Sequence, residues 1–308
     1  MVRLAALLMF VLASYYIYKM VYSQWELVRK GPREINWEMV AFGLFIFELY
    51  WLYQIYHWKR IMAVLGSSLG FIHSCQMFVT NNLLAYIPGK FANIMGMAML
   101  AKKKNVSRIH TVTTVILFQI YSLVSGVLFI AAVMVGSNGN VKNLISEEWI
   151  PFLCAGALCG IVMVMPATVN RVLALVRKIT GRQVEEVRIS FVDHLAHLLI
   201  YFFSWLILGL SMYFIVSGLG ENLLTKVYIF EITIIIIASY LMGLLAFFVP
   251  AGFGVAELGL VYGFMKLFEP AQAVWGAASF RIAGLVTLIL SYLLLLLFAV
   301  NRKQVDRF

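Results

Sequence analysis

Two short segments interrupt the long apolar stretches of this chain, and both combine proline with glycine. The first is Pro88-Gly89-Lys90, and the second is Pro250-Ala251-Gly252-Phe253-Gly254, which Glu257 follows closely. Proline lacks the N–H that continues a helix, and glycine adopts backbone angles that other residues avoid. A helix that restarts after such a break directs N–H groups toward it, and these attract anions. The two breaks therefore either line an anion-binding cavity or form kinks that neighbouring helices fill.

Charged residues inside the apolar stretches also indicate where a binding site could lie. Glu48, Glu257 and Arg281 each lie in a stretch where an unpaired charge is costly in hydrocarbon. Each must therefore face protein or water and have a partner, and Glu257 with Arg281 is the best candidate pair. Two roles stay open for this pair: it either joins two helices or presents a basic group to a phosphate.

The histidines and cysteines give weaker indications of chemistry. His194 and His197 lie at i and i+3 on one helix face and would form half of a metal site if other ligands joined them. His57, His73 and His110 are scattered, so we interpret the pair as histidines at the entrance of a membrane span. The three cysteines form no CxxC pair and predict no disulfide framework. We predict no metal and no cofactor, since no nucleotide-binding or hydrolase motif is present.

Membrane-spanning helices must position these residues. The chain has 308 residues, of which 63% are hydrophobic and 12% charged, and its mean hydropathy is +0.92. Soluble domains are about 45–50% apolar and about 25% charged, so this composition excludes a soluble enzyme, a nucleic-acid-binding domain and a disordered chain. We predict an all-α integral membrane protein with about eight transmembrane helices plus broken or re-entrant helical segments.

The apolar runs predict where the spans lie. Full spans are expected at 4–21, 37–56, 110–135, 150–170, 194–217, 225–249 and 272–300, and broken segments at 67–101 and 250–268. We expect one polytopic domain over residues 1–308, with pseudo-symmetric halves at about 1–140 and 150–308 and one broken segment in each. The first run is interpreted as an uncleaved span. Whether residues 250–270 cross fully or re-enter stays open.

The distribution of basic residues predicts the orientation. The stretches 57–66, 102–110, 171–190 and 301–308 hold 14 Lys and Arg residues, whereas 23–38, 137–149 and 218–226 hold 5. Basic loops face the cytoplasm, so we expect a multi-pass protein of the cell membrane with both termini cytoplasmic. The formal net charge of +10 then reflects topology and anionic lipid head groups, and no nucleic acid partner is expected.

Two motifs at this separation resemble a known family. Tyr86-Ile87-Pro88-Gly89-Lys90, then a basic run and Val106-Ser107, is similar to the "LPG", basic-run and "GVS" pattern of lysylphosphatidylglycerol synthase/flippase transmembrane domains. Residues 250–259, PAGFGVAELG, are similar to that family's "PGGxGxREG". Arg281 falls where members tend to carry an arginine. The resemblance covers nearly the whole chain and implies a polytopic protein that moves lipids or lipid-linked sugars across the bilayer.

The chain also departs from the family pattern. Ala251 replaces a glycine and Ala256 replaces the motif arginine, while Met97 and Phe118 or Gln119 stand where many members have Arg and Glu. Whether the change at Ala256 abolishes the family activity stays open. Some relatives carry a soluble aminoacyl-transfer domain after the membrane part. This chain ends eight residues past its last predicted span, so we expect no such domain and no lysyl transfer.

Three functions fit the sequence. The first hypothesis is flippase-like translocation of a phospholipid or polyprenyl-phosphate-linked sugar. The second is an integral-membrane transferase that acts on a lipid-linked substrate through a carboxylate base such as Glu257. The third is a membrane scaffold that recruits a glycosyltransferase through basic cytoplasmic loops. We favour a transporter over an enzyme, with an anionic lipid or lipid-linked sugar as the partner within the membrane. The lipid, the direction, the energy coupling and the oligomeric state stay open.

The first hypothesis assigns roles to the polar residues around the breaks. Lys90, Arg281 and the helix N-termini would attract a phosphate, while Glu257 would orient Arg281 or carry a proton. Asparagine and glutamine side chains would bond a sugar or glycerol. The predicted substrate-binding residues are Asn81, Asn82, Pro88, Gly89, Lys90, Asn93, Gln119, Pro250, Gly252, Gly254, Glu257 and Arg281.

Overall fold

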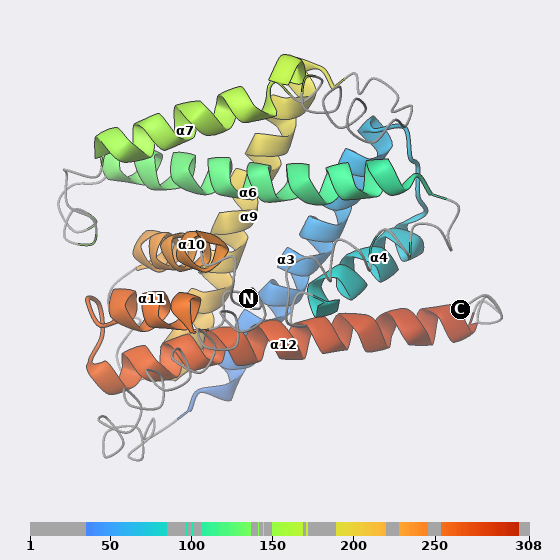
Figure 1. Cartoon of the computed structure of the whole chain (residues 1–308). Helices are drawn as coiled ribbons and strands as arrows, with labels where there is room; N and C mark the ends of the chain where they lie inside the picture. Colours follow the sequence, from blue (N-terminus) through green and yellow to red (C-terminus); the bar gives the residue numbers. More distant parts are fainter. Residues whose placement is uncertain are drawn as a thin grey trace, which may run out of the picture. The chain divides into compact units, whose positions relative to one another are not determined.

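The protein folds as helices, as its composition predicts. The computed structural model describes residues 35–84, 106–136, 150–168, 189–219, 228–245 and 254–301, together with positions 97, 100, 141, 144 and 171. These described residues form helices and no strand (Figure 1). In hydrocarbon each backbone N–H and C=O must find a partner without water, and a helix provides these partners within one segment. The all-α membrane fold class is confirmed.

Four of the described helices are long and apolar enough to span a membrane. They are α3 (Trp37–Val64), α6 (Arg108–Gly136), α9 (Phe191–Gly218) and α12 (Pro270–Asn301), with 28, 29, 28 and 32 residues. Each exceeds the roughly 20 residues that cross the hydrocarbon core, so each tilts or extends into the interface.

The helix α3 runs eight residues beyond the predicted end of its span at residue 56. Aromatic residues and the basic pair Lys59-Arg60 lie at this end of the helix, and such residues are typical of a membrane interface. Trp58, Ile61 and Met62 are instead buried in the protein. Their packing continues the helix to Val64.

Shorter helices account for the remaining described segments. They are α4 (Phe71–Leu84), α7 (Ile150–Val164), α10 (Ile229–Leu245) and α11 (Val255–Phe264). The short helices α4 and α11 lie within the two predicted broken segments. The predicted first span at 4–21 lies outside the described residues, and the total number of spans stays a prediction.

The helices divide into two compact units. The first contains α3 up to Leu52, α9 from Leu206 onward, and α10, α11 and α12. The second contains the rest of α3 and α9, most of α4, and α6 and α7. Each unit therefore draws on distant parts of the sequence. The division into sequential, pseudo-symmetric halves stays a prediction.

Small residues bring the helices of the first unit close together. On α3, the carbonyl of Gly43 accepts a hydrogen bond from the Ser211 hydroxyl of α9 at 2.7 Å. On α11, Gly259 and Gly263 lie four residues apart on one face, against Ser239 and Ile235 of α10. Lipid tails are as apolar as leucine, so close contact between helix backbones, rather than escape from water, favours association of these helices.

Polar contacts link the helices of the second unit. The Gln54 amide of α3 donates to the Ser204 hydroxyl of α9 at 3.3 Å, and the Trp205 indole of α9 donates to Ser125 of α6 at 3.1 Å. The helices α6 and α7 lie side by side (Figure 1). Gly160 of α7 faces Val124 of α6 in that contact. Both polar and small residues therefore set the packing of this unit.

We predict that Gly43→Ala destabilises the protein. A Cβ atom there would lie 2.8 Å from the Ser211 carbonyl oxygen and 3.0 Å from the Ile215 nitrogen. These are backbone atoms, so the two helices must move apart, at a cost of about 1–3 kcal/mol. Thermal unfolding of the purified protein in detergent measures the loss. The matched control is Gly156→Ala on α7, where a Cβ would meet nothing within 4 Å. Equal melting temperatures for the two variants would contradict the described contact between α3 and α9.

Candidate functional site

The last glycine of the second proline-glycine break, Gly254, directly precedes α11. Gly254 has a φ of +88°, in the left-handed region that favours glycine, and precedes Val255, the first helical residue. Its N–H donates to Oε2 of Glu257 at 2.6 Å, and its carbonyl accepts from Leu258 at 2.9 Å. A carboxylate at the third helical position both satisfies an otherwise unpaired N–H and interacts favourably with the helix dipole. Glu257 therefore fixes where α11 starts.

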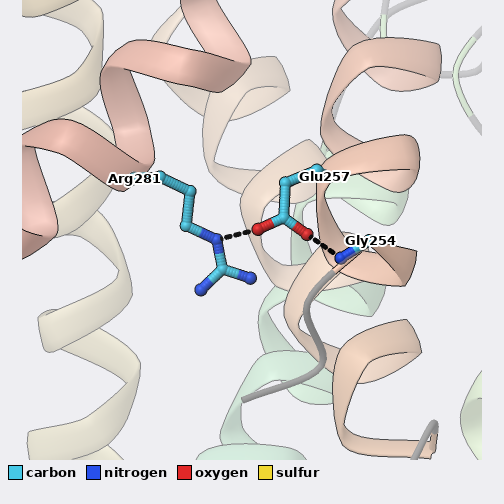
Figure 2. Close-up of polar contacts among 3 residues, drawn as sticks. All are labelled: Gly254, Glu257 and Arg281. Carbon is cyan, nitrogen blue, oxygen red and sulfur yellow. Dashed lines mark hydrogen bonds and ion pairs between the residues drawn. The ribbon is translucent and has the colours of Figure 1, made fainter. Parts of the chain in front are cut away.

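The other oxygen of the same carboxylate faces a basic residue on α12. Oε1 of Glu257 forms an ion pair with Nε of Arg281, and the two side chains are 14% and 22% exposed (Figure 2). Both carboxylate oxygens are thus engaged, one by the start of α11 and one by α12. The pairing of these two residues agrees with the sequence-based expectation, while their role in binding a substrate stays a prediction.

The guanidinium of Arg281 meets the carboxylate through its Nε. Figure 2 shows the dashed line that runs from this nitrogen to Glu257. A guanidinium has five N–H donors in a planar fork that matches carboxylate and phosphate oxygens. Arg281 makes further contacts besides this ion pair. The ion pair therefore fixes the side of the guanidinium that faces α11.

Two polar contacts join α3 to α12 in the same unit. The Trp51 indole donates to the Thr287 hydroxyl at 3.0 Å, and the Ser291 hydroxyl donates to Oε1 of Glu48. Thr287 and Ser291 are four residues apart and share a face of α12. Glu48 thus has a polar partner, as a carboxyl group within a span requires.

Several predicted site residues lie elsewhere. Asn81 and Gln119 belong to the second unit, on α4 and α6, and Oδ1 of Asn81 is buried without a hydrogen-bond partner among the described residues. Asn82 lies near the end of α4 and makes contacts of its own. The described contacts therefore bring together Gly254, Glu257 and Arg281. The predicted residues outside the described part of the chain are Pro88, Gly89, Lys90, Asn93, Pro250 and Gly252.

The second unit contains a histidine cluster that was not predicted from the sequence. His57 on α3 and His197 on α9 are buried and lie 3.0 Å apart, Nε2 to Nδ1. On the next turn, Nδ1 of His194 is 2.6 Å from the hydroxyl of Tyr121 on α6. The interpretation of His194 and His197 as histidines at a span entrance stays a prediction; both lie in the first two turns of α9 and are buried. Within the described segments, no three His, Cys, Asp or Glu side chains are placed to hold a metal ion.

A comparison with protein families shows to which family the chain is related. Residues 2–300 match the lysylphosphatidylglycerol synthase TM region. The chain belongs to this family. The match confirms the resemblance seen in the motifs at 86–107 and 250–259. Together with the apolar helices, it makes the chain a multi-pass membrane protein and associates it with lipid handling. No curated protein matches the chain.

We predict that Glu257→Ala destabilises the protein more than Glu257→Gln does. Alanine leaves both the Gly254 N–H and Arg281 without their acceptor, which costs about 1–3 kcal/mol. Glutamine keeps one carbonyl oxygen that can accept from the Gly254 N–H, although it loses the charge and the acceptor that faces Arg281. Thermal unfolding in detergent measures both, with Glu269→Gln as a control that removes an exposed carboxylate.

A double-mutant cycle separates the ion pair from these other effects. Glu257→Gln and Arg281→Gln, made singly and together, should show a coupling of at least about 0.5 kcal/mol. Strictly additive losses of stability would mean that the two side chains do not interact in the folded protein.

Proposed function

We propose that this protein translocates an anionic lipid between the two leaflets of the cell membrane. The substrate is either a phospholipid or a polyprenyl-phosphate-linked sugar. The observation that carries the proposal is the Glu257–Arg281 ion pair at the N-terminus of the short helix α11. The family match supports the proposal, because lysylphosphatidylglycerol is itself a phospholipid. Both termini lie in the cytoplasm in the proposed topology.

A phosphate would bind beside Arg281. Its oxygens would accept hydrogen bonds from the fork of the guanidinium, which suits a phosphate better than a point charge does. The N-terminus of α11 adds roughly half a positive charge. Glu257 opposes the bound phosphate because it already pairs with Arg281. This competition weakens binding, which a translocator needs because it must also release its substrate.

The surface of α12 offers a path for the lipid tails. Beside Arg281, a row of exposed apolar side chains follows the helix at intervals of three or four residues: Ile282, Val286, Ile289 and Leu293. Residues at this spacing share one face of a helix. Acyl or isoprenoid chains would lie along this face within the bilayer while the head group contacts Arg281. The geometry thus separates a polar head-group contact from an apolar tail contact.

The remaining predicted residues complete the proposed site. Lys90 at the first break would supply a second basic group, and Asn82 and Asn93, which belong to the same unit as Arg281, would bond a sugar or glycerol. The breaks at 88–89 and 250–252 would expose helix N-termini to the head group. The sequence contains no nucleotide-binding motif, so the proposed energy source is an ion gradient or the lipid gradient itself.

The transferase hypothesis receives less support from this geometry. A catalytic base needs an oxygen that can take a proton from the substrate. Both oxygens of Glu257 are engaged, one by the Gly254 N–H and one by Arg281. Glu257 is therefore better placed to orient Arg281 than to act as a base.

We predict that Arg281→Gln and Glu257→Gln slow lipid movement in liposomes that contain the purified protein. One charge-assisted contact is worth about 1.5–3 kcal/mol, so its loss lowers the rate about tenfold or more. Fluorescent phosphatidylglycerol and a short polyprenyl-phosphate-sugar are the test lipids. Fluorescent phosphatidylcholine, which has no net negative charge, serves as the control lipid.

Two charge-matched variants serve as controls. Lys266→Gln and Glu269→Gln each remove one exposed charge from the turn between α11 and α12 without touching the ion pair. Both should move lipid at the wild-type rate. Equal rates for Arg281→Gln and Lys266→Gln would remove Arg281 from the site. If the folded wild-type protein moved none of the lipids, translocation of these lipid classes would be refuted.

A further inference from the structure

A second carboxyl group within the apolar helices has an environment unlike that of Glu257. Glu48 lies within α3, and its Oε1 accepts a hydrogen bond from the Ser291 hydroxyl of α12. Its other oxygen, Oε2, is buried and has no hydrogen-bond partner in the described part of the chain. Within the described residues, one hydroxyl is thus the hydrogen-bond partner of this carboxyl group.

Among the described residues of the first unit, the basic residue on α12 lies away from Glu48. Arg281 is ten residues from Ser291 along α12, which is about 15 Å at 1.5 Å per residue. Its Nε is already paired with Glu257. Within the described residues, Glu48 therefore has no ion pair.

The side chains that the structure describes around this part of α3 are uncharged. On α9, Ser211 bonds to the Gly43 carbonyl and Phe214 packs against Phe42. On α12, Thr287 bonds to Trp51. The titratable side chains nearest in sequence are tyrosines, which are neutral at pH 7: Tyr50 and Tyr53 on α3 and Tyr292 on α12. Nothing among these residues offsets a negative charge on Glu48.

The two protonation states of Glu48 differ greatly in cost. An ionised carboxylate in an apolar site needs a cation or several donors, and one neutral hydroxyl does not replace its lost hydration. A neutral carboxyl group with one unsatisfied oxygen is far less costly. We propose that Glu48 is a proton-binding site and that it carries a proton in the conformation described here. When water reaches the site, the O–H bond breaks and the proton passes to water, leaving the carboxylate.

This site has a consequence for transport that rests on the proposed function. The sequence offered Glu257 as a proton carrier, but both of its oxygens are engaged, one by Arg281 and one by the Gly254 N–H. Glu48 takes that role instead. Proton binding and release at Glu48 would then couple lipid movement to a pH gradient, while Glu257 and Arg281 bind the head group.

Infrared spectroscopy of the protein in liposomes tests the proton site without any transport assay. A protonated carboxyl group has a carbonyl stretching band that a carboxylate lacks, and the chain has only 14 Asp and Glu residues. We expect this band at pH 7 in the wild type and its loss in Glu48→Gln. Two matched controls, Glu257→Gln and Glu38→Gln, remove a paired and an exposed carboxylate and should keep the band.

A second variant keeps the test decisive if Glu48→Gln folds poorly. Ser291→Ala removes the hydroxyl that donates to Oε1 and should move the band to higher wavenumber, because the carbonyl loses its hydrogen bond. A wild-type spectrum without the band, or a band unchanged in both variants, would show that Glu48 is ionised and overturn the proposal.

Lipid movement under a pH gradient tests the coupling separately. The wild-type rate should change several-fold when the gradient is imposed, and the Glu48→Gln rate should not respond. A wild-type rate that ignores the gradient would refute coupling but not the proton site. If the wild type moved no lipid at all, the proposed function would fail while the infrared result still decided whether Glu48 binds a proton.

Discussion

A carboxylate held between a helix N-terminus and an arginine organises the C-terminal part of this protein. Glu257 accepts the Gly254 N–H with one oxygen and pairs with Arg281 through the other. Without the first contact, the start of α11 would have an unsatisfied donor next to a broken segment. The second contact gives the guanidinium in α12 a partner of opposite charge, which a charged group within an apolar helix requires. The same three groups therefore fix the position of α11 and place a basic group beside an exposed apolar helix face.

Glu257 and Glu48 have different surroundings, and we propose different chemical roles for them. Glu257 has a cation and a backbone donor as partners, which fix its position beside Arg281. Glu48 has one hydroxyl partner, and its second oxygen is buried without a hydrogen-bond partner among the described residues. A translocator of anionic lipids that is driven by an ion gradient needs both functions: a site for the head group and a site for the coupling ion. We propose that the first unit supplies one carboxyl group for each.

The helices associate through small residues and polar contacts rather than through bulk hydrophobicity. Gly43 lets α3 and α9 meet at their backbones, and Gly259 with Gly263 does the same for α11 and α10. In the second unit, hydrogen bonds of buried histidines, tyrosine and glutamine cross between α3, α6 and α9. Such contacts have a defined geometry, so they hold each helix in one rotation about its axis. That rotation decides which side chains face protein and which face lipid.

The sequence by itself determined the fold class, most helix positions, the family and the Glu257–Arg281 pair. Hydropathy and helix-breaking residues are local properties, and the two charges lie in adjacent helices close in sequence. Only the tertiary structure decided the partners of Glu48 and His57, which lie 243 and 140 residues away. It also decided that α3 continues to Val64. Lipid and protein interior are equally apolar, so an apolar sequence does not encode which neighbour each helix face meets. Partners of isolated polar residues therefore emerge only when the helices have packed.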